Sequence, residues 1–213
     1  MAASPKTTTT DSFNQIATVR IELFDTDPLI WREVEVPTST TLKVLHDIIQ
    51  LTIGWAGYHL WEFTIAKQRY GEALEDDWGR EPPLDAMKVR LRDVLAPRRT
   101  KIDYMYDFGD GWEHRLTVSK VRQGVAGVAY PRYVGGEWNG PPEDCGGTHG
   151  FYDCLAAQSD PKHPRHEEIS RWLGEYEPDE ININAIGVGL GHLAARRNAA
   201  AKRLAKKKPD AKS

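Results

Sequence analysis

The sequence predicts a single α+β domain over residues 15–190, flanked by a disordered leader (1–14) and a basic C-terminal tail (191–213). Two patterns support this fold class: apolar residues alternate in several short runs, as in half-buried strands, and recur at helical spacing between them. With 213 residues, 40% of them hydrophobic, seven Trp and eight Tyr, the chain can build one well-formed and largely aromatic core. We therefore expect one domain.

A hairpin opens the domain. Residues 16–24 and 30–36 each alternate between apolar and polar side chains, and in the first run Val19, Ile21 and Leu23 share one face. Between them, residues 25–28 read Asp-Thr-Asp-Pro, in which aspartates cap their own backbone and proline fixes φ. Two antiparallel strands joined by a turn are predicted.

A helix and a third strand follow. Residues 42–53 place apolar side chains on one helical face, with Ser39 or Thr40 as the expected N-cap and Gly54 as the stop. Residues 59–65 alternate again and predict a strand. The order hairpin, helix, strand predicts a β-grasp-like N-terminal half.

The middle of the chain predicts a second antiparallel hairpin. Residues 71–83 are acidic and contain two prolines, which indicates a surface loop, and 89–95 predict a short strand or turn before one helical turn. The runs 101–106 and 112–118 are predicted strands joined by the glycine-containing loop 107–111.

The remainder is predicted to be mostly helical. Residues 134–150 are too long and too rich in glycine and proline for a plain connector. Short helices are expected over 151–157 and 165–174, the second preceded by Pro164. Residues 184–207 predict a helix that is firm only in its later part, because its beginning contains three glycines.

Composition favours a cytoplasmic protein. No run of eighteen apolar residues predicts a membrane span, and the first twelve residues lack the apolar segment of a secretory signal. Two cysteines, Cys145 and Cys154, are too few for a disulfide framework and fit a reducing compartment. We expect no membrane partner.

Basic residues concentrate at the C-terminal end. From residue 192 onward there are eight Lys or Arg and one Asp, although the whole chain has a formal net charge of −3, so the remainder is acidic. An acidic body is a poor binder of duplex DNA, whereas a basic tail can contact nucleic acid or simply improve solubility. The residues predicted for nucleic-acid contact are Arg196, Arg197, Lys202, Arg203, Lys206, Lys207 and Lys208.

The first candidate site is the second hairpin. Asp107, Asp110 and His114 place two carboxylates and an imidazole around one turn, where they can converge on a divalent metal or act as acid and base. The alternative is that His114 is a core histidine, because alternation puts it on the same strand face as Trp112 and Leu116. No single metal-binding motif has this spacing.

The second candidate site lies in the glycine-rich stretch. There Glu143 and Asp144 stand between two prolines and two glycines, which can present the carboxylates at a pocket. The alternative is that they cap turns and the following helix. Together the two sites give the candidate catalytic set, which comprises Asp107, Asp110, His114, Glu143 and Asp144.

An aromatic and acidic cleft is the third prediction. Its expected binding residues are Arg32, Trp55, His59, Tyr106 and Trp112. Arg32 shares a strand face with apolar residues, so it needs a carboxylate partner, for which Asp107 and Glu143 are the candidates.

These motifs resemble a known family. Over about residues 16–184 the chain is similar to the root-inducing-plasmid Orf-three-like family. The similarity is carried by the segments DPLIWR (27–32), YDFGDGWEH (106–114) and PPEDCGG (141–147), and by Leu45-His46, Ile49-Gln50, Gly54-Trp55, His59-Leu60 and Phe63. The resemblance implies an α+β fold and a mobile-element setting, with members often labelled TnpR-like resolvases or transposable-element passenger proteins. It implies no established activity.

Recombinase chemistry is disfavoured by the residues themselves. A serine recombinase needs an activated serine supported by several arginines, and none of the seven serines has this setting. A tyrosine recombinase needs His-x-x-Arg before a C-terminal tyrosine, and that element does not occur.

Three functions remain open. The favoured one is a non-catalytic binding or adaptor protein for a protein, peptide or nucleotide ligand. The others are a metal-dependent hydrolase or nuclease that uses the candidate catalytic set, and a DNA-associated accessory protein that acts through the basic tail. No cofactor is required by the sequence, and a divalent metal is compatible with it.

Overall fold

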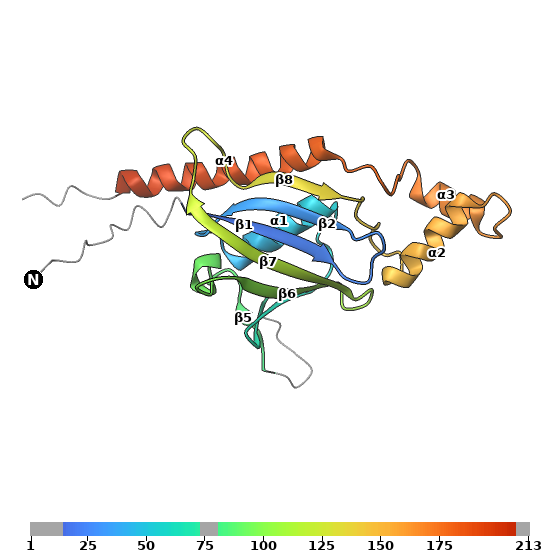
Figure 1. Ribbon diagram of the computed structural model, residues 1–213, viewed down its shortest axis with the longest axis horizontal. Coiled ribbons are helices and arrows are strands. Elements are labelled where there is room, and N and C mark those ends of the chain that lie inside the picture. The colour runs from blue at the N-terminus through green and yellow to red at the C-terminus, as the bar shows by residue number, and fades with distance from the viewer. Residues whose placement is uncertain (1–14, 73–80, 208–213) are drawn as a thin grey trace, which may run out of the picture.

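The computed structural model describes residues 15–72 and 81–207 and contains one eight-stranded sheet with helices around it (Figure 1). The strand order is β5-β4-β3-β6-β7-β1-β2-β8, antiparallel throughout except for the short β4–β5 pair. The α+β fold class is confirmed.

The strands are β1 (Gln15–Leu23), β2 (Trp31–Pro37), β3 (Trp61–Ile65), β4 (Gln68–Gly71), β5 (Leu84–Asp85), β6 (Thr100–Tyr106), β7 (Trp112–Gln123) and β8 (Arg132–Glu137). The α-helices of the described ranges are α1 (Leu42–Ile53), α2 (Gly147–Ser159), α3 (His166–Leu173) and α4 (Ile183–Lys207), and a 3-10 turn covers Leu91–Asp93.

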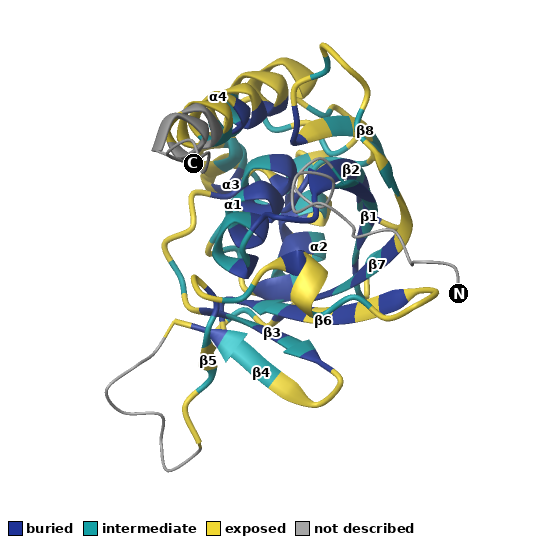
Figure 2. Cartoon of the chain, turned by 90° about the vertical axis from the view of Figure 1, so that its left-hand side faces the viewer, coloured by how far each residue is buried: buried dark blue, intermediate teal, exposed yellow. Residues whose placement is uncertain are grey.

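The core lies between the sheet and α1, where the buried residues in Figure 2 gather. The predicted inward face of β1, formed by Val19, Ile21 and Leu23, is fully buried, and so are Leu45 and Ile49 of α1. Each such side chain contributes roughly 1.5–3 kcal/mol when it leaves water. The alternation in the sequence therefore identified the correct face.

The ends of α1 differ from the prediction on one side only. Its N-cap is Thr41, whose hydroxyl accepts a hydrogen bond from Val44 N at 3.3 Å, so the expectation of Ser39 or Thr40 was wrong by two residues or one. At the other end Gly54 has a φ of 107° and caps the helix, as predicted.

Strand β8 was not predicted, because its glycines conceal it. It pairs with β2, and a Cβ on Gly136 would lie 2.7 Å from Trp31 O and 2.8 Å from Arg32 Cδ. Glycine is needed here so that the strand can approach the buried Arg32. Strand β4 was also missed, and α2 begins at 147 rather than 151.

Helix α4 packs on α1. A Cβ on Gly189 would lie 2.7 Å from Leu51 Cδ2, so this glycine permits a close helix–helix contact rather than loosening the helix. The helix begins at Ile183 and runs without a break to Lys207, and the predicted boundary between 190 and 191 falls inside it. The described basic residues of the tail, from Arg196 to Lys207, thus belong to this helix.

Some expectations concern parts that the structure does not describe or does not test. The leader 1–14 and most of the predicted loop 71–83 lie outside the described residues. The hairpin, helix, strand order of β1, β2, α1 and β3 is present, but β6 and β7 lie between β1 and β3 in the sheet, and the β-grasp likeness stays a prediction. Across the described ranges no helix is long and apolar enough to cross a membrane.

Candidate functional site

Three segments that are far apart in the sequence meet beside the end of the sheet: the loop after α1 (54–60), the β6–β7 loop (107–111) and the segment before α2 (141–146). Backbone and side-chain hydrogen bonds hold them together, from Asp107 N to Leu60 O at 2.9 Å and from Trp55 Nε1 to Pro141 O at 2.8 Å. The two candidate segments of the sequence also contact each other directly, because Gly146 N donates to Asp110 Oδ2 at 3.1 Å.

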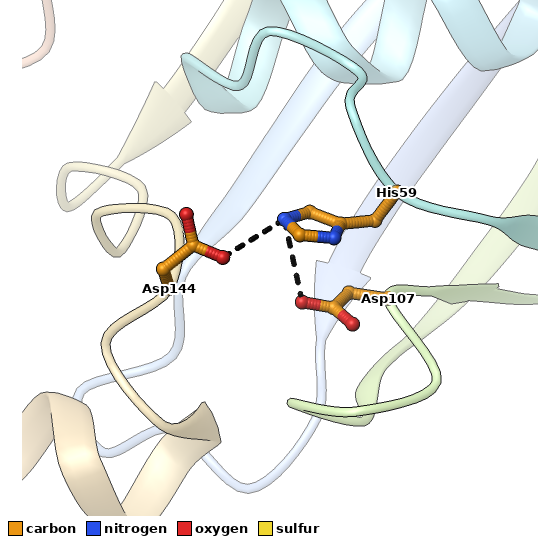
Figure 3. Close-up of side chains that lie close together, drawn as sticks. All are labelled: His59, Asp107 and Asp144. Atoms are coloured by element: carbon orange, nitrogen blue, oxygen red, sulfur yellow. Dashed lines mark ion pairs between the residues drawn. The ribbon is translucent and has the colours of Figure 1, made fainter.

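The point of contact is a cluster of His59, Asp107 and Asp144 (Figure 3). His59 Nε2 lies 3.0 Å from Asp144 Oδ1 and 3.7 Å from Asp107 Oδ2, and one ligand atom of each residue lies within 4.8 Å of the others. Within the described ranges no other group of three His, Cys, Asp or Glu residues meets this criterion. One nitrogen and two oxygens thus surround a common point.

The Nε2 atom of His59 is buried but has no hydrogen-bond partner. It lies 3.0 Å from Asp144 Oδ1, close enough for an ion pair, but it lacks the alignment of an N–H···O hydrogen bond. A buried nitrogen that faces two carboxylates without donating to either is placed as a metal ligand would be.

Both aspartates have backbone conformations in the left-handed region, with φ of 54° at Asp107 and 60° at Asp144. Aspartate tolerates this region better than most residues, and such conformations cluster at functional sites. Asp107 Oδ1 accepts a hydrogen bond from Gly109 N at 2.9 Å, and this bond holds the carboxyl so that Oδ2 faces His59.

The cluster is open on one side. The side chain of Asp107 is 13% exposed and that of His59 29%, whereas that of Asp144 is 69% exposed. An ion held by these three groups would keep coordination positions that water or a ligand can reach.

Asp110 and Glu143 act on the loops instead. Asp110 Oδ2 accepts from Gly146 N at 3.1 Å, while Glu143 accepts from Ala56 N at 3.1 Å and, through its other oxygen, from the hydroxyl of Tyr106. Burial, followed by the contact with Glu143, raises the pKa of Tyr106 well above its usual value. Asp110 thus ties the β6–β7 loop to the segment before α2, and Glu143 ties that segment to the loop after α1 and to β6.

His114 lies in the core. The residue is 1% exposed. Its ring packs near Trp55 and Tyr104 with ring centroids 5.4 and 5.2 Å away, and Nδ1 lies 3.1 Å from Trp112 O. Burial lowers its pKa to about 4, so the ring is neutral near pH 7. The structure places His114 outside the cluster, and the core alternative describes it.

Arg32 corrects a prediction, because neither Asp107 nor Glu143 is its partner. It is fully buried and donates to backbone carbonyls, from Nε to Thr52 O at 2.7 Å and from Nη1 to Trp138 O at 2.7 Å, with further bonds to Trp31 and Glu137. Burial lowers its pKa to about 10. Thr52 is in the last turn of α1, where helix carbonyls favour a cation.

The predicted aromatic residues Trp55, Tyr106 and Trp112 pack together beneath the His59 ring, on the buried side of the cluster. Trp55 stacks on Tyr106 with ring centroids 4.8 Å apart and lies 5.7 Å from Trp112, and all three residues are buried. The His59 ring packs edge-on against Tyr106 at 5.8 Å. These buried rings position His59, and they do not form an exposed aromatic cleft.

Sequence reasoning named His59 as a binding residue but did not join it to the aspartates. What joins them is the pairing of Trp61 with Tyr106 in the β3–β6 register, which puts the residues before β3 beside those after β6. No local spacing reveals this register, since it depends on long-range strand pairing.

The basic residues of the tail lie elsewhere. Arg196 and Arg197 line a groove between α4 and the beginning of α1, and Arg203 is exposed farther along α4. The side chains of Lys202, Lys206 and Lys207, and all of Lys208, lie outside the described part of the structure.

Comparisons with a family model, with a related protein and with a solved structure all match most of this chain. The family described as plasmid pRiA4b ORF-3-like protein matches residues 15–185. The chain is similar to the uncharacterized protein y4hQ of Sinorhizobium fredii, with 32% identity over 184 residues, 85% of this chain and 93% of that protein. It is also similar to a crystal structure of a protein of unknown function from Methanosarcina mazei Go1, with 29% identity, a TM-score of 0.74, and coverage of 81% of this chain and 97% of that one. Because the match spans most of the chain, this protein belongs to the plasmid pRiA4b ORF-3-like family.

Proposed function

We propose that this protein is a non-catalytic binding protein whose ligand site is a divalent-cation centre formed by His59, Asp107 and Asp144. The observation that carries the proposal is the convergence of one imidazole nitrogen and two carboxylate oxygens, from three separate segments, to within 4.8 Å. Two carboxylates held this close repel each other unless a cation or proton lies between them. A cation is therefore expected to stabilise the meeting of the three segments.

The donor set favours a first-row divalent cation. An imidazole suits zinc and its neighbours, whereas carboxylates also suit manganese, and a set of one nitrogen and two oxygens fits Zn²⁺ or Mn²⁺ better than Mg²⁺ or Ca²⁺. With bonds of about 2.0–2.2 Å, ligand atoms around one ion lie roughly 3.0–3.4 Å apart. The separations of 3.0 and 3.7 Å from His59 Nε2 need only small side-chain movements to match this.

A binding role rather than a catalytic one is supported by the neighbouring side chains. Asp110 and Glu143 accept hydrogen bonds from the loops, and His114 is sealed in the core, so three of the five residues predicted for catalysis have other tasks. An ion with three protein ligands can still accept an anionic group from a partner. We expect that group to be a carboxylate or phosphate of a peptide, protein or nucleotide ligand.

The test is calorimetric titration of the metal-free protein with Zn²⁺ and Mn²⁺, combined with metal analysis. Wild type is expected to bind one ion, and Asp107→Asn and Asp144→Asn are each expected to weaken binding by about 10-fold or more. Asp153→Asn is the matched control, because it removes the same charge from a nearby exposed carboxylate outside the cluster. Equal binding by all four proteins, or no binding by wild type, would contradict the centre.

A metal-dependent hydrolase is the second candidate, and the open side of the cluster favours it. Catalytic metal sites keep a coordination position for water, and Asp144, 69% exposed, borders such a position. The cation-loaded protein can be assayed with p-nitrophenyl acetate and bis(p-nitrophenyl) phosphate. Turnover that disappears in Asp144→Asn would replace the non-catalytic proposal with this one.

Family membership supports an accessory role on a plasmid or transposable element. Within that role we expect a cytoplasmic location, and the two cysteines support it, because Cys145 and Cys154 are both free thiols. DNA contact through the basic tail is the remaining alternative, and it is separated from ligand binding by the Arg203 variant described below.

A further inference from the structure

A second candidate site lies at the opposite end of α1 from the cation cluster. There the start of α1 and the middle of α4 line a half-open cavity of about 470 Å³, with Arg90 at its margin. From its lining we infer that this cavity binds a phosphate-bearing small molecule of nucleotide size. The inference concerns different residues from the proposed cation centre and does not depend on it.

Charge is the first argument. Three arginines line the cavity, Arg90 from the segment after β5 and Arg196 and Arg197 from α4. Among the described residues of the lining, Asp47 is the acidic one, and its carboxylate pairs with Lys43 Nζ at 2.7 Å. The forked N–H groups of a guanidinium match the oxygens of a phosphate, so arginines that line one cavity are suited to hold a phosphate group. The lining of this cavity is thus basic, although the formal net charge of the whole chain is −3.

Hydroxyl groups are the second argument. Ser39, Thr40 and Thr41 contribute to the same wall. Arg90 is held beside them, because its Nη1 donates to Ser39 O at 2.6 Å and its backbone forms a bridge with Thr41. Hydroxyls and guanidinium groups together provide the donors that a phosphate group accepts.

The helix amides are not part of the recognition. The N–H groups of Leu42 and Lys43 donate to Val89 O and Ala86 O, and that of Val44 donates to the Thr41 hydroxyl. Only the dipole of α1 adds to the positive potential. The side chains of the lining must therefore hold the anion, which makes the site testable by single substitutions.

Size and apolar surface favour a nucleotide over inorganic phosphate alone. Small-molecule sites have volumes of roughly 300–1,000 Å³, and this cavity falls inside that range. Val44 and Leu193 provide an apolar wall on which a base can lie. The close contact of Gly189 with Leu51 fixes α4 against α1, so the two walls are held at a constant separation.

The test is calorimetric titration with ATP and with pyrophosphate in buffer containing EDTA, which keeps the cation cluster out of the measurement. ATP is expected to bind wild type, and Arg90→Gln and Arg196→Gln are each expected to weaken binding by about 10-fold, as expected for loss of one charge-assisted contact. Arg203→Gln is the matched control, since it removes the same charge from the same helix outside the cavity. Because Arg196 is exposed, its substitution leaves the fold intact even if that of Arg90 does not.

A 20-nucleotide single strand of DNA distinguishes the nucleic-acid alternative. If the oligonucleotide binds, ATP does not, and Arg203→Gln weakens binding as much as Arg196→Gln, the basic tail is a nucleic-acid contact and the inference is overturned. Failure of both ATP and pyrophosphate to bind would also overturn it. Weaker ATP binding that is confined to Arg90→Gln and Arg196→Gln supports it. None of these outcomes changes the expected Zn²⁺ or Mn²⁺ titration.

Discussion

Acid is expected to destabilise this protein through its buried histidines, and His114 allows the effect to be isolated. Burial lowers the pKa of His114 to about 4, whereas in the unfolded chain it is about 6.5. Between these values the unfolded state binds a proton that the folded state does not. The free energy of unfolding therefore falls as the pH is lowered from about 6.5 toward 4 and is fully restored above about 7.

The size of the effect follows from the two pKa values. Lowering the pH from 7 to 5 is expected to reduce the free energy of unfolding by about 2 kcal/mol through His114 alone. His46, with its pKa lowered by burial to about 3, is expected to contribute a similar amount, about 2 kcal/mol. Several kcal/mol is a large fraction of the 5–15 kcal/mol typical of a domain.

The assay is urea unfolding followed by tryptophan fluorescence at pH 7 and pH 5, for wild type, His114→Phe and His149→Asn. Phenylalanine fills the space of the ring but does not titrate, so the loss of stability between the two pH values should shrink by about 2 kcal/mol in His114→Phe. His149, whose side chain is 92% exposed, serves as the control and should leave that loss unchanged. If His114→Phe loses as much stability as wild type between pH 7 and pH 5, the buried, neutral histidine is refuted.

Three further predictions concern the fold. Gly140→Ala should lower the free energy of unfolding by about 1–3 kcal/mol in thermal or urea unfolding, because its Cβ would lie 2.1 Å from Ile53 O. Gly187→Ala is the control: this glycine has open space around it inside α4, so the substitution should be neutral or should stabilise the fold by up to about 1 kcal/mol. Arg32→Lys should cost about 2–4 kcal/mol, since an ammonium cannot reproduce the forked contacts with the carbonyls of Thr52 and Trp138; a stability equal to wild type would argue against them. Thr41→Ala should cost about 1 kcal/mol in urea unfolding through loss of the α1 N-cap, and an effect as small as that of an exposed substitution would place the cap elsewhere.

The elements that the sequence predicted well are those whose own side chains carry the pattern. Strand β1 alternates over nearly its whole length, and α1 repeats its apolar face at helical spacing. Strand β8 gives no such signal, because Gly136 is selected by the approach to Arg32 rather than by strand propensity. Strand β8 can therefore be recognised from its pairing with β2 in the structure, but not from its own sequence.

The residues of the candidate site likewise fall into those that local sequence indicates and those that only long-range pairing brings in. Asp107 and Asp144 stand beside turn glycines, and this local context drew attention to both. His59 joins them only through the register of β3 with β6, which no local pattern encodes. His114 could not be separated from a ligand in advance, because alternation gives the direction of a side chain on a strand but not what lies opposite it.

The course of α4 has a consequence for experiments that shorten the chain. Strand β8 is an edge of the sheet, and α4 runs beside it (Figure 1). An edge strand carries a row of unpaired backbone groups that can join another sheet, and natural proteins often shield such edges with a helix. Truncation within α4 would remove part of this cover, so a shortened protein is expected to aggregate through β8 for reasons unrelated to ligand or DNA binding. Point substitutions on the intact helix avoid that confusion between lost binding and lost solubility.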